Sequence, residues 1–255
     1  MKLSNVFVSA AIAAVLSATA ASAEIPETVV IATEGVYPPF SFVENGKLTG
    51  FDVDIANALC EKMQTKCEIV MQEWEGMIPG LLADKYDAII AAMTITEERK
   101  KKVNFTKKYF NTPAVFIQQV GTGFTDVSPV ALAGKTVGVQ GSTTQSNLLE
   151  AKYPDTDLRS YTIVDDALAD LAAGRIDLVL TDKVLAHFWL QKSAEGCCEI
   201  TGPDLIDPLL GEGKGVAIRK EDEDLRDAFQ KALDEILSDG TYKKINDKYF
   251  PFSIY

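Results

Sequence analysis

The sequence predicts an α/β fold in which parallel-type sheets are flanked by helices. Short apolar runs rich in β-branched residues alternate with segments of helical periodicity. The alternation occurs in two successive series of similar layout, and a further strand and a long helix follow them. Strand–helix–strand order at this spacing is typical of a twisted parallel sheet covered by helices.

The first series is expected to hold strands at residues 29–32, 68–71 and 87–92 and helices at 51–63 and 77–82. Apolar side chains recur every four residues from Phe51 to Met63, which predicts an amphipathic helix. Pro79 falls near the first turn of the second helix, where its missing N–H is tolerated.

The second series is expected to hold strands at residues 136–139, 162–164 and 177–180 and helices at 143–152, 167–173 and 183–191. Residues 111–114, between the two series, are expected to be extended. A strand at 216–218 and a helix at about 222–237 follow the glycine-rich stretch 211–215. Periodicity leaves open whether this last portion completes the first series or forms a separate appendage.

The composition disfavours several classes of function. The 255 residues allow one large or two medium-sized domains, and 25 Lys and Arg against 37 Asp and Glu give a net charge of −12. No basic patch stands out, so nucleic acid and anionic membrane surfaces are not expected as partners. The single histidine, His187, disfavours His-based catalytic triads and multi-His metal sites. We expect no catalytic residues, no metal and no cofactor.

Residues 1–23 are predicted to be a signal peptide. A basic start at Met1-Lys2 precedes the mostly apolar residues 6–16 and the small-residue cleavage site Ala21-Ser22-Ala23. The apolar stretch is too short to span a bilayer, and no later stretch of about 18 apolar residues occurs. We expect an exported chain that is cleaved after Ala23; the alternative is a buried N-terminal helix.

Export makes the four cysteines informative. Cys60 and Cys67 lie across the predicted end of a helix and start of a strand, a spacing that suits a local disulfide worth ~2–3 kcal/mol. Cys197 and Cys198 are adjacent, and the sequence leaves open whether they are free, bridged to each other or intermolecular. No CxxC pattern supports zinc or a thioredoxin-like redox site.

Polar residues that directly follow strands are the candidate site residues, because ligands of open parallel sheets bind outside the carboxyl ends of the strands. They occur in the stretches 33–37, 72–74, 94–99, 140–144 and 180–182. Each also has a purely structural interpretation. Ser142, Thr143 and Asp182 suit helix N-caps. Arg99 lies in a charged run of the kind usually found on a solvated surface, and Trp74 suits a core.

Eight short motifs occur in order along the chain: YPPFSF from Tyr37, GFDVDI from Gly50, WEGMIP from Trp74, YDAII from Tyr86, MTITEER from Met93, GVQGST from Gly138, AGRID from Ala173 and DGTYKK from Asp239. Together they resemble the periplasmic solute-binding proteins of polar and basic amino-acid ABC transporters, specifically the lysine/arginine/ornithine- and histidine-binding branch. The resemblance covers essentially the whole mature chain. The Cys60–Cys67 spacing also resembles the disulfide of this branch.

The resemblance implies the two-lobed periplasmic-binding-protein fold of type II, in which each lobe is a parallel-type sheet flanked by helices and two strands form a hinge. Residues 24–111 plus 214–255 would form the first, discontinuous lobe, and residues 114–207 the second. The hinge would lie near 111–114 and 207–214, and the lobes would close on a ligand.

The resemblance also implies the roles of residues at the carboxylate end of an amino-acid ligand. Arg99 matches the arginine that binds the α-carboxylate in two places, and Thr94 matches a hydroxyl on the same group. Thr143, after Ser142 in a Gly-Ser-Thr turn that opens a helix, resembles the second-lobe contact to this carboxylate. Asp182 resembles the carboxylate that takes the α-ammonium, helped by the backbone carbonyl of Ala92.

The remaining implied contacts concern the ligand's side chain. Tyr37 and Trp74 match the aromatic pair that sandwiches the aliphatic stem. Glu34 matches the acidic residue that pairs with a distal ammonium or guanidinium, although Asp is familiar there, and Glu shortens the distal pocket.

Three positions depart from the pattern of the branch. Ala91 and Ala92 stand where serines are common, and Thr144 stands where Gln is found. The lost hydroxyls open space and admit a bulkier arginine derivative such as an opine.

The expected function is therefore extracytoplasmic capture of a cationic amino acid, of the arginine, ornithine, lysine or histidine class, or of an arginine-derived opine. The protein would be a periplasmic monomer that delivers its ligand to a membrane ABC permease and is not an enzyme. One alternative is a dehydratase-type enzyme on the same fold with Glu34 or Glu73 as general acid. Another is a ligand sensor for a membrane partner.

Overall fold

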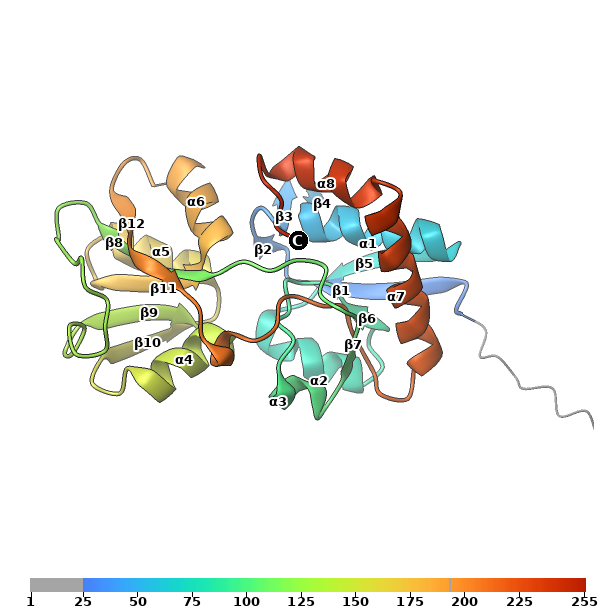
Figure 1. Cartoon of the computed structure of the whole chain (residues 1–255), viewed down its shortest axis with the longest axis horizontal. Helices are drawn as coiled ribbons and strands as arrows, with labels where there is room; N and C mark the ends of the chain where they lie inside the picture. The colour runs from blue at the N-terminus through green and yellow to red at the C-terminus, as the bar shows by residue number, and fades with distance from the viewer. Residues whose placement is uncertain (1–24, 193) are drawn as a thin grey trace, which may run out of the picture.

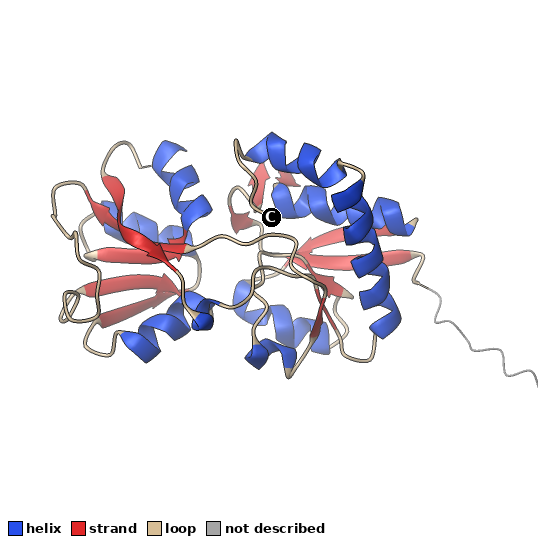
Figure 2. Cartoon of the chain, viewed as in Figure 1, coloured by secondary structure: helices blue, strands red, loops and turns tan. Residues whose placement is uncertain are grey.

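The computed structural model describes residues 25–192 and 194–255, which form two five-stranded sheets with helices packed against them and one three-stranded sheet (Figure 1). We call each five-stranded sheet with its helices a lobe; extended loops join the two lobes (Figure 2). The predicted signal peptide and its cleavage site lie outside the described residues. None of the helices in the described ranges is long and apolar enough to cross a membrane.

The sheet of the first lobe has the strand order β5-β1-β6-β13-β7. β1 is parallel to β5 and β6, whereas β13 is antiparallel to β6 and β7. The C-terminal portion, which periodicity alone could not place, therefore completes the first series. The strands are β1 (Thr28–Thr33), β5 (Lys66–Met71), β6 (Ala88–Ile89), β7 (Asn104–Phe105) and β13 (Ala217–Ile218). The small sheet beside it consists of β2 (Val36–Tyr37), β3 (Ser41–Glu44) and β4 (Lys47–Thr49).

Helices cover both faces of the first sheet. Phe51, Ile55 and Leu59 of α1 are fully buried, as their spacing predicts, and pack in one cluster with Phe229 and Leu233 of α7. A second cluster on α2 packs against the other face of the sheet. The helices of this lobe are α1 (Phe51–Met63), η1 (Trp74–Gly76), α2 (Met77–Leu82), α3 (Glu97–Lys100), α7 (Glu223–Ser238) and α8 (Thr241–Tyr249).

The sheet of the second lobe has the order β10-β9-β11-β8-β12. β9 is parallel to β10 and β11, and β8 is antiparallel to β11 and β12. Its strands are β8 (Ala114–Gln119), β9 (Thr136–Gln140), β10 (Asp157–Tyr161), β11 (Leu178–Asp182) and β12 (Cys198–Leu205). Its helices are α4 (Thr144–Lys152), α5 (Val164–Ala172), α6 (Lys183–Lys192) and η2 (Pro208–Leu210).

The strand predicted at residues 162–164 is wrong. The strand β10 ends at Tyr161, and Val164 already belongs to α5. Val164, Leu168 and Leu171 are buried on one helix face, so helical packing overrides the β-branched character of the first of them. The short strands β2–β4 and β7, the strands β8 and β12, and the helices α3 and α8 were not predicted; only residues 111–114 were expected to be extended.

Two segments cross between the lobes, one leading into β8 and one leading from β12 to β13 (Figure 1). They run antiparallel where they meet: the N–H of Lys214 donates to the carbonyl of Phe110 at 2.8 Å, and the N–H of Tyr109 donates to the carbonyl of Lys214 at 2.7 Å. The two crossings therefore form one paired structure, while the exact lobe and hinge boundaries remain a prediction.

All four cysteines are paired in the structure. A disulfide joins Cys60 in α1 to Cys67 in β5, with Cα atoms 6.0 Å apart, which confirms this pair. Cys197 and Cys198 are bridged to each other, one of the three alternatives that the sequence allowed.

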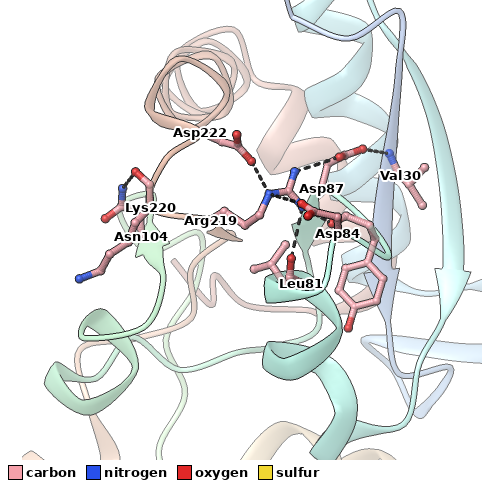
Figure 3. A network of polar contacts seen from close by, with 9 residues as sticks. Val30, Leu81, Asp84, Asp87, Asn104, Arg219, Lys220 and Asp222 are labelled. Carbon is pink, nitrogen blue, oxygen red and sulfur yellow. Dashed lines mark hydrogen bonds and ion pairs between the residues drawn. The ribbon is translucent and has the colours of Figure 1, made fainter.

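A buried arginine joins the C-terminal portion to the first sheet (Figure 3). The guanidinium of Arg219 donates to Asp222 at 2.6 Å, to Asp87 at 3.1 Å and to the carbonyl of Tyr86 at 2.7 Å. Asp87 in turn accepts the backbone N–H of Val30 in β1 at 2.9 Å. This network connects the end of β13 with the loop before β6 and with β1, so it should stabilise the returning chain.

Arg219→Met keeps the length of the side chain and removes the donor that the half-buried carboxylates of Asp87 and Asp222 and the buried carbonyl of Tyr86 share. We expect the free energy of unfolding to fall by about 3 kcal/mol, measured by urea denaturation at pH 7. Arg175→Met is the control, because Arg175 is an exposed arginine that also pairs with an aspartate, Asp170, and should cost at most about 1 kcal/mol. Equal losses in the two variants would show that the network does not stabilise the fold.

Candidate functional site

A cavity lined by residues of both lobes lies between them. Every predicted ligand-binding residue except Ser142 and Asp182 lines it, and three residues that were not predicted as ligand-binding also line it. The predicted lining residues are Glu34, Tyr37, Trp74, Ala91, Ala92, Thr94, Arg99, Thr143 and Thr144, and the additional ones are Gln140, Gln145 and Lys214.

Strand ends position most of these side chains. Glu34 directly follows β1, Trp74 begins η1 shortly after β5, and Ala91 follows β6 closely. From the second lobe, Gln140 is the last residue of β9, and Thr143 is the N-cap of α4. Because carboxyl ends of parallel strands meet at one edge of a sheet, two facing edges enclose the cavity.

Arg99 marks one end of the cavity. Its guanidinium donates to the carbonyl of Thr94 at 2.9 Å and to the carbonyl of Ser142 in the other lobe at 3.3 Å, and it lies 5.1 Å from the centre of the Trp74 ring. Burial lowers the pKa of Arg99 to about 10, so the group stays charged at neutral pH. Arg99 is half-buried and lines the cavity, so it is not a freely solvated surface residue, whereas the neighbouring Lys101 is exposed and pairs with Glu98.

The N-terminus of α4 lies beside Arg99. Thr143 caps the helix by accepting the N–H of Ser146 at 3.1 Å, and the Ser146 hydroxyl accepts the N–H of Thr143 at 3.1 Å. Thr143 is thus both an N-cap and a lining residue of the cavity. Ser142 contributes through its backbone, because its carbonyl accepts the indole N–H of Trp74 at 3.1 Å, while its side chain is exposed. A helix N-terminus next to an arginine is suited to binding an anion.

Glu34 offers an acceptor for a cation elsewhere in the cavity. Its Oε1 accepts a hydrogen bond from Nε2 of Gln140 at 2.6 Å, and Gln140 also donates to the carbonyl of Thr162 at 3.1 Å. Burial raises the pKa of Glu34 to about 7; the Gln140 hydrogen bond opposes this rise, and Asp165 adds to it. Within the described residues no lysine, arginine or histidine forms an ion pair with Glu34.

Asp182 lies behind the cavity wall and does not line the cavity. Its side chain accepts the N–H of Val184 in the first turn of α6 at 2.9 Å and a short hydrogen bond from the hydroxyl of Thr112. Burial raises its pKa, and the charge of Lys214 is the largest influence that lowers it. The capping interpretation of Asp182 is therefore supported by its contact, and its predicted role toward an α-ammonium remains a prediction.

A second buried carboxylate supports the cavity wall. Oδ1 of Asp52, at the start of α1, accepts the hydroxyl of Tyr109 at 2.9 Å, and the oxygen of that hydroxyl accepts the N–H of Ala92 at 3.1 Å. Burial raises the pKa of Asp52 to about 7. The chain from Asp52 through Tyr109 fixes Ala92, which has a φ of 49°, at the wall of the cavity.

Two of the three additional lining residues lie in or beside a candidate stretch: Gln140 belongs to residues 140–144, and Gln145 follows them directly. Lys214 lies in the second crossing, between Gly213 and Gly215, where no motif indicated a ligand contact. Gln140 belonged to the GVQGST motif but carried no assigned role.

No group of three metal-ligating side chains occurs in residues 25–192 or 194–255.

Known proteins are similar to this chain in sequence and in fold. Residues 29–252 match the family model described as bacterial extracellular solute-binding proteins, family 3. The L-arginine-binding protein of Pseudomonas aeruginosa is 44% identical over 231 residues, 88% of each chain, and the histidine-binding periplasmic protein of Escherichia coli is 39% identical over 246 residues, 94% of each. The structure of an ancestral arginine-binding protein bound to arginine superposes with a TM-score of 0.83 at 36% identity and covers 89% of this chain and 100% of that one.

The raised pKa of Glu34 predicts a pH-dependent stability of the ligand-free protein. Because the folded-state pKa of about 7 exceeds the ordinary value of 4.5, the folded state binds the proton more tightly, and stability falls as pH rises between these two values. Glu34→Gln keeps an acceptor for Gln140 and removes this loss, so the variant should gain about 3 kcal/mol over the wild type between pH 4 and pH 8.

Urea denaturation at pH 4, 6 and 8 measures the difference. Glu73→Gln is the matched control, because Glu73 is exposed and does not line the cavity; it should show no such trend. A difference between wild type and Glu34→Gln that stays constant with pH would contradict the prediction.

Proposed function

Because the chain belongs to family 3 of the bacterial extracellular solute-binding proteins, we propose that it captures a small molecule that is anionic at one end and cationic at the other. The ligand class is a cationic amino acid, such as arginine, ornithine, lysine or histidine, or an arginine-derived opine. The observation that carries the proposal is the arrangement of Arg99 and the α4 N-terminus around one part of the cavity, with Glu34, which forms no ion pair in the described chain, in the same cavity.

The carboxylate, the distal cation and the stem of the ligand then each have a partner. Arg99, the Thr94 hydroxyl and the N–H groups at the start of α4 bind the carboxylate, because a planar guanidinium and a helix N-terminus both stabilise a carboxylate. Glu34 binds the distal cation, whose charge returns the pKa of Glu34 toward its ordinary range. Tyr37 and Trp74 pack against the aliphatic stem between the two ends.

Closure of the two lobes is part of this proposal. Trp74 and Arg99 of the first lobe donate to the carbonyl of Ser142, and Glu34 accepts from Gln140 of the second lobe. Every one of these bonds joins the lobes through a residue of the cavity or its rim. A ligand held between the lobes therefore adds contacts to both sides and favours the closed arrangement.

Delivery to a membrane ABC permease, a periplasmic location and a monomeric state complete the proposal. The relatives named above are binding proteins, which supports binding without catalysis. Of the two acids considered for a dehydratase, Glu73 does not line the cavity, and Glu34 does. Incubation with arogenate or prephenate should give no aromatic product; formation of such a product would favour the enzyme.

Isothermal titration with arginine and citrulline tests the distal contact. Citrulline replaces the guanidinium with a neutral urea group, so it cannot form the ion pair with Glu34. Glu34→Gln should weaken arginine binding on the order of 100-fold and citrulline binding far less. Equal losses for the two ligands would show that Glu34 is not the distal partner.

Arg99→Met tests the carboxylate contact. The variant should weaken arginine and citrulline alike, on the order of 100-fold, because both ligands carry the same α-carboxylate. Lys101→Met removes a nearby positive charge that is exposed and pairs with Glu98, and it should leave both affinities within about 2-fold. A near-neutral Arg99→Met would place the carboxylate elsewhere.

A further inference from the structure

Gln140 joins the two lobes through its side-chain amide. Its Nε2 donates to Oε1 of Glu34 in the first lobe at 2.6 Å and to the carbonyl of Thr162 in the second lobe at 3.1 Å. A backbone carbonyl can only accept, so the amide nitrogen, and not the amide oxygen, faces Thr162. Both N–H groups of the amide are therefore engaged, and its orientation is fixed.

The backbone of Gln140 is also held in place. Gln140 pairs with Tyr161 in the parallel ladder of β9 and β10, and the N–H of the following Gly141 donates to the carbonyl of Tyr161 at 2.9 Å. The carbonyl of Gln140 accepts the hydroxyl of Thr143 at 2.8 Å, and only 6% of the residue is exposed. The amide of Gln140 is thus presented to the cavity from a fixed strand end.

One oxygen of Glu34 and one of Gln140 remain for a ligand. Within residues 25–192 and 194–255, Oε2 of Glu34 and Oε1 of Gln140 form no hydrogen bond, and neither is one of the fully enclosed side-chain atoms that lack a partner. Both residues line the cavity, so these two oxygens are open to it. The hydrogen bond between Glu34 and Gln140 keeps them close together. They form a pair of acceptors that opposite lobes contribute.

A guanidinium suits this pair of acceptors better than a primary ammonium does. Its planar fork of N–H groups can donate to two separate oxygens at once, and its faces can lie against aromatic rings. An ammonium is a compact and strongly hydrated charge, so two protein oxygens replace less of its hydration. The amide of Gln140 cannot turn toward a smaller cation without breaking its bonds to Glu34 and Thr162. Two fixed oxygens therefore favour the wider, planar cation.

Resting on the proposed function, we infer that Glu34 and Gln140 act as a paired acceptor that selects a guanidinium over a primary ammonium at the distal end of the ligand. Glu34 supplies the negative charge. Gln140 supplies the second oxygen and thereby determines the preference. Ligands with an arginine tail are then bound more tightly than lysine and ornithine. Because the two acceptors come from opposite lobes, the guanidinium also bridges the lobes.

Isothermal titration of the wild type with ligands that share a head and differ in the tail tests the inference. Arginine is compared with lysine and with homolysine, whose longer chain brings its ammonium to the reach of the arginine guanidinium. Octopine is compared with lysopine, which carries the same two-carboxylate head on a lysine tail. Within each set, the guanidinium ligand should bind about 10-fold or more tightly than the ammonium ligands, as expected for one additional hydrogen bond to a charged group.

Gln140→Met keeps the length of the side chain and removes the amide oxygen and nitrogen. The variant should reduce the preference for arginine over homolysine to about 3-fold or less, because arginine loses a hydrogen bond that homolysine does not make as well. A purely structural effect, such as a displaced Glu34, would weaken both ligands alike, because both need the carboxylate. Gln140→Leu is the second variant, in case Gln140→Met does not fold.

Gln118→Met is the matched control. Gln118 is a buried glutamine of the same sheet whose Nε2 also donates to a glutamate, Glu199, at 2.9 Å, but it does not line the cavity. This variant should keep the wild-type preference for arginine. An equal loss of preference in Gln118→Met and Gln140→Met would assign the effect to the packing of the second lobe and overturn the role of Gln140.

The outcomes separate this inference from the proposed function. A wild type that binds homolysine or lysopine as tightly as the matching guanidinium ligand overturns the inference, and so does a preference that both Gln140 variants leave unchanged. Either result leaves capture of a cationic ligand intact. Failure of all five ligands and of histidine to bind the wild type overturns both proposals.

Discussion

Charges that are enclosed between two lobes must be compensated, and this requirement governs the cavity. Burial disfavours the charged form of any group. Burial raises the pKa of Glu34 to about 7, and the hydrogen bond from the neutral amide of Gln140 only partly opposes this rise. Arg99 contacts two carbonyls and an aromatic ring. The protein thus leaves a negative and a positive group to be neutralised by one ligand that reaches both.

The fold meets this requirement by placing charges on rigid elements. Glu34 follows the strand β1, whose neighbours on both sides are parallel. Thr96 is the N-cap of α3, and its side chain accepts the N–H of Arg99. The backbone of Arg99 is therefore held in place by the short helix α3. Lys214 is held by pairing between the two crossings. The polar groups of the cavity are therefore positioned before a ligand arrives, which lowers the ordering cost of binding.

The sequence was most informative where a residue's role depends on its neighbours in the chain. The helix α1 has the bounds that its apolar spacing predicts, and Arg99 and Thr143 lie in short motifs. Pairing between segments far apart in the chain was harder to predict from the sequence. Lys214 approaches Thr94 because two segments about 100 residues apart, near 110 and 214, pair in space, and no local pattern encodes that pairing. The strand predicted at residues 162–164 failed for a related reason, since burial of one helix face decided between two local preferences.

Ligand charge and lobe closure are physically linked in this arrangement. The hydrogen bonds that join the lobes at the cavity are few, and each contributes about 0.5–1.5 kcal/mol net when neutral and about 1.5–3 kcal/mol when one group is charged, so they bias the closed arrangement modestly. Two of their donors or acceptors, Arg99 and Glu34, are also the charged groups at the cavity. A ligand that neutralises both reduces the cost of enclosing them and thereby favours closure. A ligand of the wrong charge leaves one of them buried and unpaired, and the closed arrangement then becomes the less stable one. Under the proposed function, specificity would therefore be exerted through closure as well as through direct contact.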